Sequence, residues 1–246
     1  MLKESIFISL LLLSSFTATA QLEKVESFYS AMQKLAKEEG QTLRFVNADD
    51  GLVEDFSQLS QIILLRHGEP ALNKKGWRKR KEAMQFVKDY DSVGIYKPAF
   101  VPIVLSKNEL SVIHTSSINR SIATANKVLG LQDIQKPQPL FREFERKIFS
   151  FFNIKLPLKW WLTGSRVFWF MGMNKRGIES FGEAKKRAQK AALFLEEDAM
   201  QNGKTLLVSH GLLNHYLVKY LKKNGWEEVY DGGKGYLSQK MLVKYQ

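Results

Sequence analysis

Three short apolar runs, each followed at once by polar residues, form the clearest pattern along the chain. They cover residues 61–65, 110–114 and 205–208 and are rich in leucine and β-branched residues. A short apolar run without alternation is typical of a strand buried on both faces, as in a parallel sheet. We therefore predict three buried strands with polar side chains at their ends.

Between and around these runs, apolar residues recur at helical spacing. The spacing predicts helices over residues 22–39, 117–129 and 180–200 and a further helix after residue 211, whereas residues 41–58 predict irregular structure. Ser116 and Ser117 are good N-cap residues for the second helix. Strands that alternate with helices build a layered α/β fold.

The sequence pattern of the first twenty residues indicates a segment that is not part of this fold. Lys3 precedes an apolar stretch at 6–16, and Ala18-Thr19-Ala20 then supplies small residues, which is the layout of a secretory signal peptide cut after Ala20. The stretch holds about 11 residues, against the roughly 20 of a spanning helix; a buried N-terminal helix is the alternative. We expect an exported protein, periplasmic or secreted, with a helical extension at 21–59 and one principal domain at 60–246.

The charge of the chain limits the classes of binding partner to expect. Of 246 residues, 37 are Lys or Arg and 25 are Asp or Glu, so the net charge is +12, and there is no cysteine. A strongly basic chain favours anionic partners. The basic cluster at 74–81 either steers such partners or is the solvated start of a helix. Because it holds only Trp77 as a stacking residue, we expect no nucleic acid partner.

The polar residues after the apolar runs are expected to meet, because ligands of open α/β sheets bind beyond the carboxyl ends of the strands. His67 then offers an imidazole, a good nucleophile toward phosphorus. Arg120, about one turn into a predicted helix, can bind a phosphate together with the helix N-terminus. Taken singly, His67 would be a structural histidine and Arg120 a surface ion pair; together with His210 they favour a phosphate site.

Three motifs in order carry a family resemblance. The first is Arg66-His67-Gly68-Glu69 with Asn73; the second is Ser116-Ser117 with Arg120 and Thr124-Ala125; the third is Ser209-His210-Gly211. Over roughly residues 60–223 the chain resembles the histidine phosphatase superfamily, which is phosphoglycerate mutase-like. The resemblance implies a three-layer sandwich, with a mostly parallel central sheet and helices on both faces.

The resemblance also implies roles for these residues. His67 would form a phosphohistidine, and the phosphoryl group would be held by Arg66, Asn73, Arg120 and His210, without metal or other cofactor. The family uses a carboxyl group as general acid and then base. Glu143 is our choice for it, with Glu145 in reserve; a salt bridge at the surface is the alternative for Glu143.

Other features are ambiguous or structural. His114 lies within an apolar run and is expected in the core, and the five-residue spacing of His215 from His210 does not suit a metal pair on one helical face. The aromatic-rich insert at about 149–175 has three interpretations: buried packing, a cap that selects a phosphate ester with an apolar tail, or a patch that contacts an anionic membrane surface.

The sequence therefore predicts a phosphatase that hydrolyses a small phosphomonoester through His67, with Glu143 as general acid and base. A phosphoglycerate mutase-type transfer is the rival among enzymes, and export argues against it because glycolytic intermediates belong to the cytoplasm. A catalytically silent phosphate-binding protein is the rival from another class.

Overall fold

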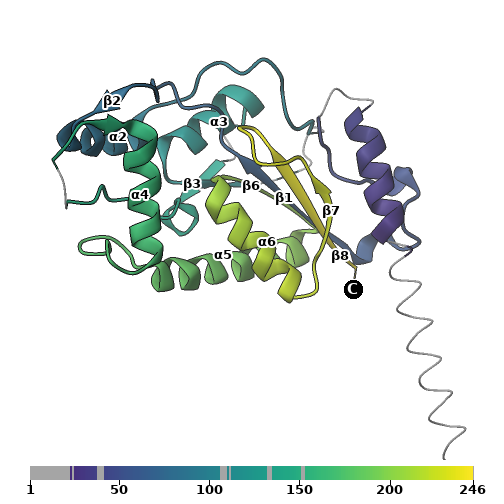
Figure 1. Cartoon of the computed structure of the whole chain (residues 1–246). Coiled ribbons are helices and arrows are strands. Elements are labelled where there is room, and N and C mark those ends of the chain that lie inside the picture. Colours follow the sequence, from purple (N-terminus) through teal and green to yellow (C-terminus); the bar gives the residue numbers. More distant parts are fainter. Residues whose placement is uncertain are drawn as a thin grey trace, which may run out of the picture.

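A six-stranded sheet forms the centre of the molecule (Figure 1). The computed structural model describes residues 23, 25–37, 42–105, 110, 112–131, 135–150 and 153–245. The strands of the sheet are β1 (Leu59–Arg66), β3 (Ile113–Ser116), β4 (Gln135–Gln138), β6 (Lys204–Ser209), β7 (Glu227–Asp231) and β8 (Gln239–Tyr245). A separate two-stranded ribbon pairs β2 (Trp77–Arg78) with β5 (Leu156–Pro157).

The order of the strands is β4-β3-β6-β1-β8-β7. The first four are parallel to one another, and β8 is antiparallel to β1 and β7. The predicted mostly parallel sheet is confirmed, and the three apolar runs supply β1, β3 and β6. The second run lies partly outside the described residues, and β3 extends beyond it to Ser116.

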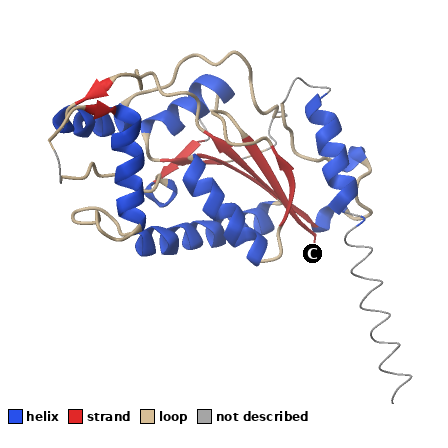
Figure 2. Cartoon of the chain, viewed as in Figure 1, coloured by secondary structure: helices blue, strands red, loops and turns tan. Residues whose placement is uncertain are grey.

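Helices cover both faces of this sheet (Figure 2). They are α2 (Arg80–Ser92), α3 (Asn119–Leu129), α4 (Leu158–Phe170), α5 (Phe181–Asn202) and α6 (Gly211–Lys223), together with a helix at residues 25–37. Short 3-10 helices lie at Ala48–Asp50, Phe56–Gln58 and Pro139–Phe141. The predicted signal peptide, residues 1–20, lies outside the described residues.

Alternate residues of the strands enter two different cores. Ile62 and Leu64 of β1 pack with α5 and α6 on one face, and Ile63 and Leu65 pack with α3 and residues 25–37 on the other. Burial on both faces explains why the sequence of β1 is a continuous apolar run. Met32 of the N-terminal helix is fully buried in the second of these cores. The division of the chain at residue 60 stays a prediction.

The start of α3 differs from the prediction. The N-cap residue is Ile118, with no side-chain cap, rather than Ser116 or Ser117. The Ser116 hydroxyl accepts a hydrogen bond from the Ile118 N–H at 3.2 Å, so this serine shapes the turn before the helix instead of capping it.

Helices α2 and α4 form a unit beyond one end of the sheet (Figure 1). The sequence pattern did not predict α4; for α2 it indicated only a helix start in the basic cluster at 74–81, as one of two interpretations. The two helices share a small core of their own with the loop that precedes α4, built from Ala83, Phe86, Ile148, Phe149, Leu158 and Trp161. The insert at 149–175 therefore contributes buried packing through α4, while Trp160 on its outer side is 68% exposed.

Candidate active site

His67 follows β1 directly and is buried, with 2% of its surface exposed. Its Nδ1 lies 2.7 Å from the carbonyl oxygen of Gly68. Because a carbonyl oxygen only accepts, Nδ1 carries the proton, and the lone pair of Nε2 is left free. That lone pair accepts from Nε of Arg120 at 3.1 Å. The reactive nitrogen of His67 thus faces a guanidinium.

Gly68 allows this turn. A Cβ added there would lie 2.9 Å from Cδ1 of Ile95, so a larger residue would require the Ile95 side chain to move. The Gly68 N–H donates to the hydroxyl of Thr124 at 2.9 Å, which links the end of β1 to α3.

Arg120 lies in the first turn of α3 and is also 2% exposed. Its Nη1 donates to the carbonyl oxygen of Tyr90 and to Oδ1 of Asp91, both at 2.8 Å. The end of α2 therefore fixes the guanidinium of α3 against His67.

His210 follows β6, and the pairing of Arg66 with Ser209 brings it beside His67; the two ring centroids are 5.1 Å apart. Nε2 of His210 lies 2.8 Å from the hydroxyl of Ser116. Ser116 already accepts from a backbone N–H, so its own proton can be donated to Nε2. Nδ1 then carries the proton of His210, and this buried atom has no partner among the described residues.

Arg66 is held from the C-terminal part of the chain. It donates to the carbonyl oxygen of Lys234, and its guanidinium lies 4.5 Å from the ring centre of Tyr236. The Tyr236 ring is also 5.7 Å from that of His67, and Lys74 lies over the same ring. Of the basic cluster at 74–81, Lys74 is thus the residue that faces the site.

Burial lowers the pKa of His67 well below its ordinary value of 6.5, and the charge of Arg120 lowers it further; the bond to Gly68 opposes these effects. Burial likewise lowers the pKa of His210, followed by the charge of Arg120. Both rings are therefore neutral at neutral pH, as a nucleophile requires.

Glu143 and Glu145 occupy different places. The carboxylate of Glu143 accepts from the N–H of Phe144 at 2.9 Å and from that of Leu212, at the start of α6, at 3.4 Å. The carboxylate of Glu145 accepts from the N–H of Glu179 at 2.6 Å and faces Arg142 at 3.6 Å. Glu145 is thus bound to the neighbouring loop, whereas Glu143 holds the helix that begins beside His210.

A pocket of about 270 Å³ opens beside His67. Its lining combines five residues that the sequence predicted with others that it did not suggest: Arg66, His67, Arg120, Glu143 and Glu145 are the predicted ones, and Phe86, Val87, Tyr90, Asp91, Ile118, Arg142, Phe144, Arg146, Leu162 and Arg166 are the others. His210 is not part of this lining and is fully buried beside His67. The structure does not bring Asn73 into this pocket; Asn73 is exposed and accepts from the N–H of Lys75 at 2.9 Å.

Tyr90, Asp91, Arg146 and Tyr236 were missed by the sequence reasoning. Tyr90 and Asp91 lie at the end of α2, of which the sequence suggested only a start in the basic cluster, and Tyr236 reaches the site through a loop before β8. None of these three residues has a local sequence signal. His114 was predicted as a core residue and is 3% exposed, with Nε2 3.2 Å from Asp198.

The described residues contain no group of three or more His, Cys, Asp or Glu side chains placed to hold a metal ion. In the same part of the chain, each helix is too short or too polar to cross a membrane.

Comparison with known proteins identifies the family. The family model of the histidine phosphatase superfamily (branch 1) matches residues 62–238. None of the curated proteins matches the chain. Similar solved structures include the Bacillus stearothermophilus protein YhfR, with 23% identity, a TM-score of 0.40 and coverage of 66% of this chain and 80% of that one.

Two phosphatases are also among the similar structures. Mycobacterial glucosyl-3-phosphoglycerate phosphatase is 16% identical, with a TM-score of 0.41 and coverage of 75% of this chain and 90% of that one. Phosphoserine phosphatase from Entamoeba histolytica, in complex with 3-phosphoglyceric acid, is 15% identical, with a TM-score of 0.38 and coverage of 74% and 89%. The family model covers well over half of the chain, and the chain therefore belongs to the histidine phosphatase superfamily.

Proposed function

We propose that the protein hydrolyses a phosphomonoester through a phosphohistidine on Nε2 of His67. Membership of the superfamily supports a phosphatase. The observation that carries the proposal is the fixed tautomer of His67, in which Nδ1–H is bound to Gly68 and Nε2 faces Arg120 inside the pocket. Phosphoryl transfer needs positioning and charge stabilisation above all, and Arg66, Arg120 and Nδ1–H of His210 supply both.

In the first step Nε2 of His67 attacks phosphorus, the bond from phosphorus to the ester oxygen breaks, and Glu143 gives its proton to the leaving alcohol. In the second step Glu143 takes a proton from water, the water oxygen attacks phosphorus, and the phosphorus–nitrogen bond breaks. Inorganic phosphate leaves, and His67 and Glu143 return to their first states. Apolar side chains of the pocket, Phe86, Val87 and Leu162, contact the carbon part of the ester.

Trapping of the intermediate tests this mechanism. Acid quenching during turnover of a ³²P-labelled ester is expected to leave acid-labile label on the wild-type protein and none on H67A, since no other nitrogen occupies that position. H215A is the matched control, because His215 is exposed on α6, and it should keep the label. Label transferred to an acceptor alcohol, rather than released as phosphate, would establish the mutase-type reaction; no label and no turnover would establish a silent binder.

The choice of Glu143 has its own test. E143Q is expected to lower kcat by about 10²–10⁴-fold on an alkyl phosphate, whose leaving group needs a proton, and by less on p-nitrophenyl phosphate, whose leaving group does not. E145Q should stay within a few-fold of the wild type because an amide oxygen can still accept from Glu179. The reverse pattern would assign the acid to Glu145.

We further propose that the chain is exported and that residues 1–20 are removed. Mass spectrometry of the mature protein from fractionated cells should give an N-terminus at Gln21, and an intact N-terminus in the cytoplasmic fraction would contradict export. A second proposal is contact with an anionic membrane surface through the exposed side chains of Trp160, Val167 and Phe170 on α4 and of Met171 directly after it. If the purified protein does not pellet with anionic liposomes at low salt, the proposed membrane contact is wrong.

A further inference from the structure

Among the arginines that line the pocket, Arg146 is the one that makes neither a hydrogen bond nor an ion pair within the described part of the chain. It follows residues 140–145, the acid-bearing segment that contains Glu143 and Glu145, and it lines the pocket beside His67. Its Nε is shut off from solvent and has no hydrogen-bond partner there, and its guanidinium makes no ion pair with a described carboxylate. Burial lowers the pKa of this guanidinium, which reports the same unfavourable environment.

The other arginines of this wall differ from Arg146. Arg166 donates to the carbonyl oxygens of Phe144 and Glu145, each at 2.9 Å. Arg142 faces the carboxylates of Glu145 and Glu179 at 3.6 and 3.5 Å. These two guanidiniums hold the acid-bearing segment in place, a task in which Arg146 takes no part.

The acidic groups near Arg146 are engaged elsewhere. Glu143 accepts from two backbone N–H groups, and Asp91 is paired with Arg120. Burial raises the pKa of Tyr90 to about 12, so this residue remains a neutral phenol. A buried, uncompensated charge is strongly destabilising, and an anionic ligand that pairs with it relieves this penalty.

Arg146 makes no hydrogen bond or ion pair with the phosphoryl cradle, by which we mean Arg66, Arg120 and His210 around His67, whereas Arg120 donates directly to Nε2 of His67. Besides burial, which lowers the pKa of Arg146, the carboxylate of Glu143 raises this pKa and the charge of Arg120 lowers it. The cradle around His67 already provides two guanidiniums and a histidine for one phosphoryl group. A further cation across the same pocket is therefore suited to a different anionic group.

We propose that the pocket takes a small phosphomonoester with a second anionic group, a carboxylate or a second phosphate, and that Arg146 pairs with that second group. The volume of about 270 Å³ limits the connecting carbon skeleton to a few carbons or one sugar ring. This proposal depends on the proposed function in one respect: it assumes that the phosphoryl group of the substrate lies at His67.

Calorimetric binding of three phosphonates, which cannot be hydrolysed, tests the pairing. The ligands share a three-carbon skeleton: propylphosphonate, 3-phosphonopropanoate and propane-1,3-diylbisphosphonate. We expect the wild-type protein to bind at least one of the last two about tenfold or more tightly than propylphosphonate, and the stronger of the two identifies the second group as carboxylate or phosphate.

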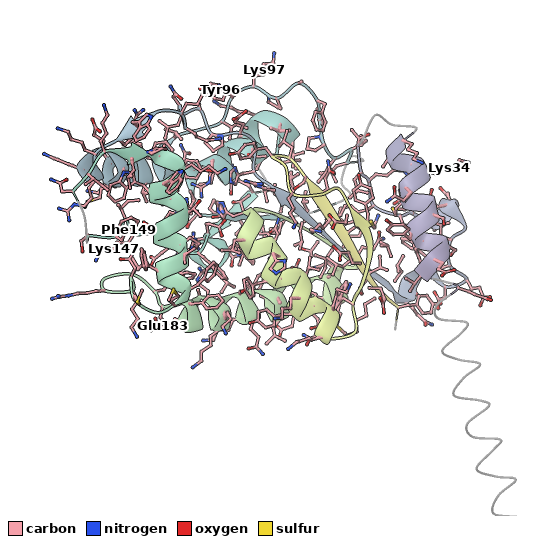
Figure 3. The ribbon with its side chains drawn as sticks, in the orientation of Figure 1. Lys34, Tyr96, Lys97, Lys147, Phe149 and Glu183 are labelled. Carbon is pink, nitrogen blue, oxygen red and sulfur yellow. The ribbon has the colours of Figure 1, made fainter. Side chains whose placement is uncertain are left out.

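Arg146→Gln is expected to reduce this preference to about twofold and to leave the Kd of propylphosphonate within about twofold of the wild type. Arg146→Lys should keep part of the preference, because the charge remains without the bidentate fork. Lys147→Gln is the matched control: Lys147 is the next cation along the chain but is exposed at the outer edge of the molecule beside α4 (Figure 3). It should behave as the wild type.

Stability provides a second readout. Because Arg146→Gln removes an unmatched buried charge, the ligand-free variant should melt at the same temperature as the wild type or higher. Equal weakening of all three ligands by Arg146→Gln, no preference in the wild type, or a lower melting temperature of the ligand-free variant would overturn the proposal. If Arg146→Gln fails to fold, Arg146→Lys replaces it in the test. An Arg146→Lys variant that prefers the doubly anionic ligands as strongly as the wild type does would overturn the proposal.

Phosphate release from propyl phosphate, and from the corresponding three-carbon ester that has the second anionic group, is measured separately. No release from either ester, together with a binding preference that depends on Arg146, would remove the proposed function and leave this inference standing. Release of phosphate without a binding preference that depends on Arg146 would support the proposed function and overturn the pairing of Arg146 with a second anionic group.

Discussion

At the scale of single residues, the protonation of His67 decides what the site can do. Its pKa is lowered by burial and by Arg120, so the neutral form extends to more acidic pH than for a free histidine. An NMR titration of the ring protons, with H67N for assignment, should give a midpoint well below 6.5. A midpoint at or above 6.5 would contradict the described environment.

The same shift has a consequence for folding stability. As pH falls below about 6.5, the unfolded chain takes up protons on His67 and His210 before the folded protein does, because the folded state lowers the pKa of both. The stability that they contribute at neutral pH is therefore lost progressively between pH 6.5 and the lower pKa of the folded state. Urea unfolding across this range should show a steeper loss of stability for the wild type than for H67N.

Residues of the site differ in how far the sequence could reveal them. His67, Arg120 and His210 follow or begin elements whose apolar patterns are local, so topology alone predicted that they meet. Tyr90, Arg146 and Tyr236 depend on how α2, the acid-bearing segment and the loop before β8 are placed. Those placements result from contacts between distant parts of the chain, for which a single sequence contains no local signal.

At the scale of elements, α5 holds the acid-bearing segment through one side chain. Arg187 donates to the carbonyl oxygens of Leu140 at 3.1 Å and Arg142 at 2.7 Å, and its guanidinium pairs with Glu179. We regard Arg187 as a positioning residue for Glu143, since it touches the backbone of that segment and not the pocket.

Replacement of Arg187 by methionine should therefore loosen Glu143 without touching His67. We expect kcat to fall about 10–100-fold on an alkyl phosphate and much less on p-nitrophenyl phosphate, with partial recovery in R187K. An equal loss on both esters would indicate a general structural role.

A comparison of α5 with α2 shows why some helices can be predicted from the sequence and others cannot. Helix α5 has a capping box at Ser180 and Glu183 and an alanine-rich buried face, and its predicted extent was close to the observed one. Helix α2 begins in the basic cluster and buries only Ala83 and Phe86, so its apolar face is too narrow to stand out.

At the scale of the whole molecule, residues 25–37 belong to the same core as the sheet. Met32 is fully buried there, and its replacement by alanine should lower the free energy of unfolding by about 2–5 kcal/mol. Y29A, on the exposed side of the same helix, is the control and should change it by less than about 0.5 kcal/mol. Denaturant unfolding of both variants provides the comparison; similar values would place the helix outside the cooperative unit.

The last strand has a consequence for the order in which the site is completed during synthesis. β8 lies inside the sheet, between β1 and β7, and the loop before it carries Tyr236 and the carbonyl that holds Arg66. A chain that stops before residue 234 still has His67 but lacks β8, the carbonyl oxygen of Lys234 and the ring of Tyr236, so Arg66 loses its support. A partly synthesised chain should therefore remain inactive until this late segment has emerged and paired with β1.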